Sequence, residues 1–255
     1  MSAAIRELWR RGATEVATRV PWATRTAAAA IALCLANVGT AAAKPPPPHK
    51  GFQMYLVPLS GFSIPAGEAT GASGDALHTR YGPQWVPFAG GIGVKLRTDL
   101  YVGAYLYTTV GPAGDDPYVR QQCEDNTADF DNDIKCSSKT LGWGVEARYF
   151  FTPGERVAPS LDFGLGPTQA AEHLEDNQGY SETVSLTGMD LVRVGPGVDF
   201  RFSRGFGLGF FANLAIGRYH RTQTVIENTE TFDDTVSQPT LHAWFSSGLR
   251  LVIMP

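Results

Sequence analysis

Charged residues recur at alternate positions inside otherwise apolar segments of this sequence. Glu146 and Arg148, for example, stand two residues apart, which places both side chains on one face of an extended chain. Charges gathered on one buried face must pair, because an isolated buried charge is very costly. The pattern predicts a salt-bridge network, and the carboxylates Glu146 and Asp162 have cations at hand and no evident cleft for acid–base catalysis. The set is Lys95, Arg97, Glu146, Arg148, Asp162, Arg193, Asp199, Arg201 and Arg250.

A second candidate site is the acidic segment 124–133. Asp129, Asp131 and Asp133 alternate as in calcium-binding loops, yet the glycine and the terminal bidentate glutamate of an EF-hand are missing. We interpret the segment as a solvated acidic loop, with a calcium site as the alternative. No other cofactor is expected.

Cys123 and Cys136 flank this segment and are the only cysteines after residue 43. An even number of cysteines in an exported chain favours a disulfide. The bond would close a loop of about 14 residues and stabilise the fold by roughly 3 kcal/mol in the chain-entropy model.

The segments that carry these charges have a period of two residues, which is typical of β-strands. In 206–217, Phe206, Leu208 and Phe210 begin an apolar face, whereas the opposite face is mostly glycine and other small residues. A half-buried strand in water would instead carry lysine, glutamate and threonine opposite its apolar face. Small residues inside and apolar residues outside predict a β-barrel in a membrane.

Eight such strands follow one another, and short and long connections alternate strictly between them. The three short ones, at Thr98-Asp99, Thr152–Glu155 and Ser203–Gly205, are rich in turn formers, and the four long ones are polar. Both chain ends therefore fall on the short-turn side. The expected strands are 51–59, 84–97, 100–110, 139–151, 157–170, 188–202, 206–220 and 239–254; the long connections are 60–83, 111–138, 171–187 and 221–238.

The outward side of each strand is expected to be apolar. Strand 84–97 shows the pattern, while strand 51–59 is ambiguous. Prolines remove ladder hydrogen bonds, so each of them predicts a bulge or a local gap in the ladder. The outward residues of 84–97 are Val86, Phe88, Ile92, Val94 and Leu96; the prolines are Pro58, Pro87, Pro159, Pro167 and Pro196.

The chain begins with a predicted signal peptide, 1–43. Five arginines precede a short apolar run, and Ala41-Ala42-Ala43 offers a cleavage site. The proline-rich stretch 44–50 is a periplasmic tether, and 51–255 is one barrel domain. Without 1–43 the chain has 16 basic and 23 acidic residues, a net charge of −7, which argues against nucleic acid as a partner.

With these features the sequence resembles the small outer-membrane β-barrel proteins, the class of OmpA-type transmembrane domains, OmpX and OmpW. The resemblance covers about 44–255 and rests on pattern rather than on a diagnostic motif. It implies an all-β, eight-stranded antiparallel up-and-down barrel in the outer membrane of a Gram-negative bacterium, with short periplasmic turns and long extracellular loops. In that class the last strand usually ends in an aromatic residue read by the barrel-assembly machinery, whereas this chain ends Met254-Pro255.

The first functional hypothesis is a monomeric, non-enzymatic barrel, either structural or a restricted, porin-like path for small solutes or ions. Its charges would form a plug that holds the lumen shut, or a gate whose partners exchange. Membrane lipid, outer-leaflet lipopolysaccharide and the assembly machinery are the expected partners. A small cavity open to the outside, lined by Trp85, Trp244 and His242, is an alternative to close packing of the upper lumen.

Two other functions remain as alternatives. The first is a lipid A-modifying acyl enzyme, for which histidine would be the base, but no flanking block matches a lipid A deacylase. The second is an exported soluble ligand-binding barrel, which would have an apolar interior, whereas the faces are reversed here. The candidate histidines are His78, His173, His220 and His242.

Overall fold

The computed structural model describes residues 50–70, 76–114, 135–175, 180–226, 230–236 and 239–254, all within the compact unit Pro45–Pro255. The predicted signal peptide, the tether up to residue 49, and Cys123, Asp129, Asp131 and Asp133 lie outside the described residues. The elements are β1 (Gly51–Gly67), α3 (Leu77–Arg80), β2 (Gln84–Lys95), β3 (Leu100–Pro112), β4 (Lys135–Phe150), β5 (Val157–Glu175), β6 (Ser181–Arg201), β7 (Phe206–Ile226), β8 (Glu230–Thr235) and β9 (Leu241–Ile253).

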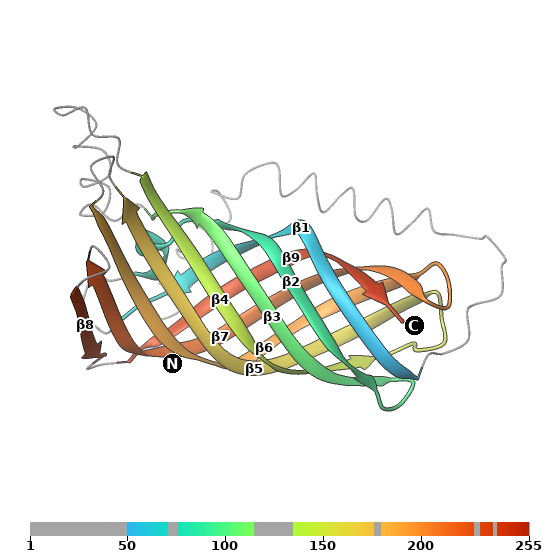
Figure 1. Cartoon of the computed structure of the whole chain (residues 1–255). Coiled ribbons are helices and arrows are strands. Elements are labelled where there is room, and N and C mark those ends of the chain that lie inside the picture. The colour runs from blue at the N-terminus through green and yellow to red at the C-terminus, as the bar shows by residue number, and fades with distance from the viewer. Residues whose placement is uncertain are drawn as a thin grey trace, which may run out of the picture. The chain divides into compact units, whose positions relative to one another are not determined.

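The strands close into an antiparallel barrel, as the sequence predicts. Each strand from β1 to β7 pairs with the next, β7 pairs with β9, and β9 pairs with β1. Figure 1 shows these tilted strands, with β8 as an additional short strand. Because β8 pairs with β7 beyond the end of β9, the closed ring contains eight strands. No helix among the described residues has the length and hydropathy needed to cross a membrane.

The outer surface of the ring is apolar. On β7, Phe206, Leu208 and Leu214 are 37–40% exposed, whereas Phe211 and Tyr219 face inward and are nearly inaccessible. Similar outward rows on β3, β4, β5 and β9 match the predicted outer faces. Because apolar side chains on a closed barrel need an apolar solvent, this surface is the part of the protein that lies in lipid.

The height of this apolar band can be followed along β7. Its outward residues are apolar from Phe206 to Ile216 and become polar at Arg218 and His220. This stretch of 11 residues is the length that a tilted strand needs to cross the hydrocarbon. The band therefore starts at the short turns and ends where the long connections begin.

The strands run further toward the long connections than predicted. Strand 51–59 continues to Gly67, 206–220 continues to Ile226, and 188–202 begins at Ser181. Strand 139–151 begins at Lys135 and strand 157–170 ends at Glu175. Above the lipid the outer face turns polar, so the alternation fades while the backbone ladder continues.

The prediction for β2 was wrong at Val86. This residue is 3% exposed and faces inward, whereas its neighbour Trp85 is 68% exposed. The register against β3 shifts between Trp85 and Phe88, where Pro87 cannot donate to the ladder. The bulge exchanges the two faces, so Trp85 lies on the outer surface and does not line a cavity.

Three other prolines also coincide with ladder irregularities, as predicted. The register of β1 shifts between Pro58 and Gly61, and paired positions are missing beside Pro167 in the β4–β5 ladder and at Pro196 in the β6–β7 ladder. Pro159 lies beyond the last β4–β5 pair, and the β5–β6 register is continuous there. The ambiguous strand β1 directs Gln53, Tyr55 and Val57 inward.

The orientation of the barrel generates the first testable prediction. Protease added to intact cells should cleave within 111–138 or 221–238 and leave Thr98-Asp99 and Ser203–Gly205 intact, because the short turns face the periplasm. Mass spectrometry of the released peptides would locate the cuts. Cleavage at a short turn in unbroken cells would reverse the orientation.

The disulfide remains a prediction, since Cys123 lies outside the described residues and Cys136 stands at the start of β4. Alkylation of the mature protein without reductant should label neither cysteine, and reduction should make both reactive. Quantitative labelling before reduction would show that the two thiols are unpaired.

Candidate functional site

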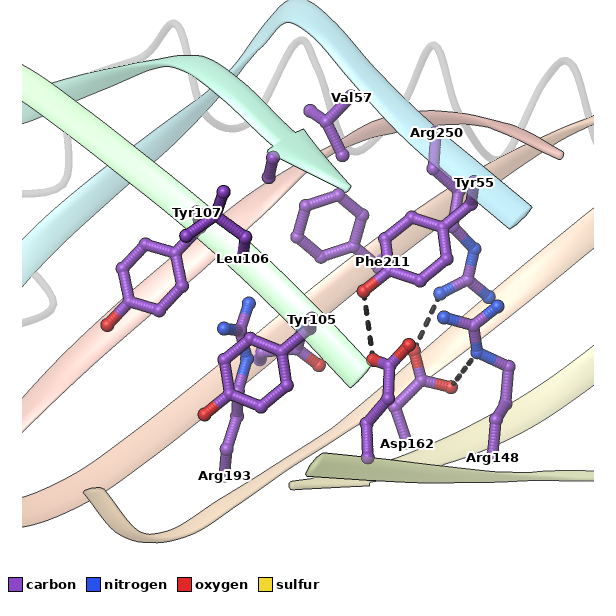
Figure 2. Close-up of a pocket in the computed structure, with 13 residues that line it drawn as sticks. Tyr55, Val57, Tyr105, Leu106, Tyr107, Arg148, Asp162, Arg193, Phe211 and Arg250 are labelled. Carbon is purple, nitrogen blue, oxygen red and sulfur yellow. Dashed lines mark hydrogen bonds and ion pairs between the residues drawn. The ribbon is translucent and has the colours of Figure 1, made fainter. Parts of the chain in front are cut away.

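Four charged side chains form a connected layer across the lumen, and we call Arg148, Asp162, Asp199 and Arg250 the arginine layer. Arg148 Nε lies 2.9 Å from Asp162 Oδ1, and Arg250 Nη1 lies 2.6 Å from Asp162 Oδ2. Arg250 Nε reaches Asp199 Oδ1 at 2.9 Å. Figure 2 shows the two arginines converging on Asp162, which accepts one cation on each oxygen.

The strand register explains how these side chains meet. Arg148 on β4 and Asp162 on β5 are direct cross-strand partners. Asp199 on β6 and Arg250 on β9 are separated by β7, where Gly209 is the partner of both. A side chain at 209 would collide with the Asp199 carboxylate, so glycine leaves the space through which Arg250 reaches it.

The arginine layer is buried, and its charges pair with one another. The four side chains are at most 10% exposed. Ser160 adds a hydroxyl that donates to Asp162 and accepts from Arg250 at 3.1 and 3.2 Å. Removing one partner from a buried ion pair costs roughly 3–5 kcal/mol, because the other charge remains without compensation.

Glu146 differs from the two aspartates. Its Oε2 accepts a hydrogen bond from Tyr55 at 2.9 Å, and it forms no ion pair with another described residue. Glu146 thus contacts a tyrosine directly, whereas Asp162 and Asp199 contact arginines. The Arg148 guanidinium instead lies over the ring of Tyr55, 4.7 Å from its centroid.

The three remaining basic residues near the short turns have separate surroundings. Lys95 is buried, with Nζ 4.0 Å from the centre of the Phe150 ring, and Arg201 donates to the Pro153 carbonyl at 2.6 Å. Arg97 lies outside the lumen: its side chain is 74% exposed and pairs with Asp99 in the β2–β3 turn. Placing Arg97 in the lumen was wrong, because the inward row of β2 ends at Lys95.

Above the arginine layer, the tyrosine layer consists of Tyr105, Tyr107 and Arg193. The Arg193 guanidinium lies 5.0 and 4.8 Å from the centroids of the two rings, a cation–π arrangement. Figure 2 shows Arg193 beside Tyr105. Among the described residues Arg193 has no ion pair, so the tyrosine faces supply its electrostatic contact.

A cavity of about 20 Å³ lies between the two layers, lined by residues that include Glu146, Arg193 and Asn213. A buried water needs roughly 10–15 Å³ of such volume. The space therefore holds about one water and is too small for a solute.

Glycines opposite tyrosines account for the close filling of the lumen. A Cβ at Gly142 would overlap the Tyr107 ring, and one at Gly91 would overlap the ring of Tyr55. The predicted packing of tyrosine beside glycine is confirmed.

Asp190 is a lumenal charge that the sequence analysis missed. Its carboxylate is fully buried and accepts from the Tyr107 hydroxyl at 3.3 Å. The β6 register shifts between Asp190 and Val192, which places both Asp190 and Arg193 inside although they are three residues apart. In the sequence, two adjacent apolar residues, Leu191 and Val192, interrupt the alternation and indicate this bulge. Both side chains face lipid in the structure.

The extracellular end is closed by what we call the mouth cluster: Leu77, Tyr81, Tyr219, His242 and Trp244. Leu77 and Tyr81 come from the first long connection and are fully buried. Trp244 donates to the Tyr219 hydroxyl at 3.1 Å, and Tyr219 stacks on His242 with ring centroids 4.0 Å apart. Trp244 and His242 therefore belong to a packed interior and not to a cavity open to the outside.

A polar group beside the mouth cluster was also missed. Gln84 donates to Ser138 at 2.9 Å and accepts from Thr140 at 2.9 Å, and Thr109 donates to the same oxygen. These residues have no charge and no motif, so only the register of β2, β3 and β4 identifies them as neighbours.

The four candidate histidines have different surroundings in the part of the chain that the structure describes. His78 and His220 are exposed, His173 bonds to Thr183, and His242 lies 3.8 Å from Asp190 in the closed interior. Within the described ranges no group of three or more metal-ligating side chains occurs. The calcium candidate at Asp129, Asp131 and Asp133 stays a prediction, because it lies outside them.

Comparisons with known proteins found distant similarity to solved structures. No family model and no curated protein matches the chain. Among solved structures, a major outer membrane protein from Thermus thermophilus is 12% identical, with a TM-score of 0.44 over 79% of this chain and 99% of its own. Ail of Yersinia pestis, in complex with the heparin analogue sucrose octasulfate, is 12% identical, with a TM-score of 0.44 over 80% and 99%. Outer membrane protein W of E. coli is 13% identical, with a TM-score of 0.30 over 78% and 97%.

This protein is a membrane-spanning β-barrel. The closed ring and its lipid-facing band establish this, since closed barrels are the β-structures that span membranes. At identities of 12–13% and TM-scores below 0.5, no activity of these proteins can be assigned to this chain.

The arginine layer generates a prediction about stability. Asp162→Ala should lower the thermal midpoint of heat-modifiable gel migration, because Arg148 and Arg250 then lose their shared carboxylate. The expected cost is roughly 3–5 kcal/mol, and less where water enters. Glu68→Ala, at an exposed position of the first long connection, is the control. Equal midpoints for the two variants would show that the lumenal charges are not coupled.

Proposed function

We propose that this protein is a non-enzymatic, monomeric outer-membrane barrel whose lumen is closed, and that it serves as a structural element presenting its long connections at the cell surface. The observation that carries the proposal is Asp162, which holds Arg148 and Arg250 together across the lumen. A barrel of eight strands has an interior that side chains alone can fill.

Closure at three levels supports this function over that of an open pore. The arginine layer, the tyrosine layer and the mouth cluster follow one another along the axis, and the cavity between the first two holds about one water. A solute would have to separate buried ion pairs and displace packed aromatic rings.

Single-channel recording in planar bilayers tests the closed lumen. The refolded wild-type barrel should give no current steps, whereas Asp162→Ala should leak, since its two arginines no longer hold a shared partner. Heat-modifiable migration of the same samples shows that each is folded. Regular current steps from the wild type would contradict the proposal.

A restricted ion path is the second candidate, and one observation favours it. Glu146 and Arg193 both line the cavity, and their common cross-strand neighbour is Gly164. Neither makes an ion pair with a described residue, so Arg193 could leave the tyrosine faces for Glu146. If the wild type conducts, Arg193→Gln should change its conductance, and selectivity should favour anions, as a cationic path does.

The lipid-modifying alternative has less support, because the side chains of His242 and Asp190 are fully buried. A lipid A mass spectrum that depends on the protein would favour it. As partners of the proposed scaffold we expect membrane lipid, outer-leaflet lipopolysaccharide and the barrel-assembly machinery, and no nucleic acid.

A further inference from the structure

Arg218 occupies an unusual position at the upper edge of the apolar band. It points outward from β7, directly above Ile216 on the same face, and it is exposed. Its cross-strand neighbours are Met189 of β6 and Leu241 of β9, which are 41% and 53% exposed toward lipid. A guanidinium thus stands in the last row of lipid-facing side chains.

Lys139 on β4 has an equivalent position. It is exposed, and its cross-strand neighbours are Val110, which is 41% exposed, and Ala171. Lys139 and Arg218 are each 12 residues from an outward phenylalanine at the periplasmic end, Phe151 and Phe206 respectively. Strands of one barrel share a common tilt, so the two cations lie at about the same height in the membrane.

No described residue supplies a counter-charge to either cation. Lys139 and Arg218 form no ion pair with any residue that the structure describes, although Arg221, just above, pairs with Asp233 at 2.7 Å. Long basic side chains at the edge of a bilayer extend their charged ends to the interface. The anion at that height is the phosphate of a lipid headgroup.

The charge of the long connections distinguishes a membrane phosphate from a soluble one. Segments 60–83, 111–138, 171–187 and 221–238 together contain 17 acidic and four basic residues. This surface repels polyanions that approach from solution. Phosphates of lipid headgroups lie in the plane of the membrane beside the barrel wall, so they reach Lys139 and Arg218 without passing the acidic connections.

We propose that Lys139 and Arg218 bind phosphate groups of outer-leaflet glycolipid, each on its own stretch of the barrel wall. The inference rests on the proposed lipopolysaccharide partner and names its contacts. Because β5 and β6 separate the two residues, each contacts a different phosphate. The planar guanidinium of Arg218 can take two phosphate oxygens at once, whereas Lys139 acts as a point charge.

The test is a titration of the refolded protein in detergent micelles with diphosphoryl lipid A, in which native mass spectrometry counts the bound lipid. A Lys or Arg close to an anionic membrane surface contributes about fivefold to affinity, so each of the two separate sites should bind lipid A roughly fivefold more weakly in K139Q/R218Q. Dephosphorylated lipid A should bind the wild type and this variant equally. Inorganic phosphate should not compete.

One matched control keeps the positive charge at both positions, and the other removes a positive charge elsewhere in the barrel. K139R/R218K should retain most of the affinity, and Arg204→Gln, at an exposed periplasmic turn, should leave it unchanged. Wild-type affinity in a folded K139Q/R218Q barrel would overturn the assignment, and competition by inorganic phosphate would show a site for soluble anions instead. Neither outcome bears on the closed lumen, which conductance tests separately.

Discussion

Asp162 is shared by two arginines from different walls of the barrel, and the rest of the interior is organised around that contact. A carboxylate with both oxygens engaged fixes how far Arg148 and Arg250 can separate, and hence how β4, β5 and β9 face one another. The four charges of the arginine layer are tolerable inside because each pairs at hydrogen-bond distance. Gly209 belongs to the same arrangement, since a larger residue would keep Arg250 from Asp199.

The barrel reverses the usual arrangement of a soluble protein, and this reversal links its stability to its environment. Lipid covers the apolar band, so the hydrophobic surface does not hold the strands together as a core would. The closed ladder of backbone hydrogen bonds and the polar interior provide that cohesion.

The period-two alternation was sufficient to predict the eight-stranded ring, its short turns and most outward residues, because lipid imposes an unbroken rule on the outer face. The prediction of inward and outward residues failed where a β-bulge reverses which alternate residues face the lumen. Val86 and Asp190 each lie beside a register shift, and one extra residue moves a side chain from lipid to lumen. The ends of the strands were also missed, because the alternation fades above the lipid: in β7 four consecutive polar residues, 221–224, follow His220. Contacts across the lumen, such as that of Arg250 with Asp162, depend on closure and have no signature in local sequence.

The pairing of tyrosine rings with glycines has a consequence for how such a chain diverges. Outward positions face a fluid, so leucine, valine, isoleucine and phenylalanine can replace one another there with little constraint from shape. Inward positions are coupled: a methyl group at Gly142 is tolerated only if Tyr107 becomes smaller. The outward residues of each strand can thus be substituted quickly, while the inward residues change in compensating pairs. Descendants of one barrel would keep their strand register long after their sequences had ceased to be recognisably related.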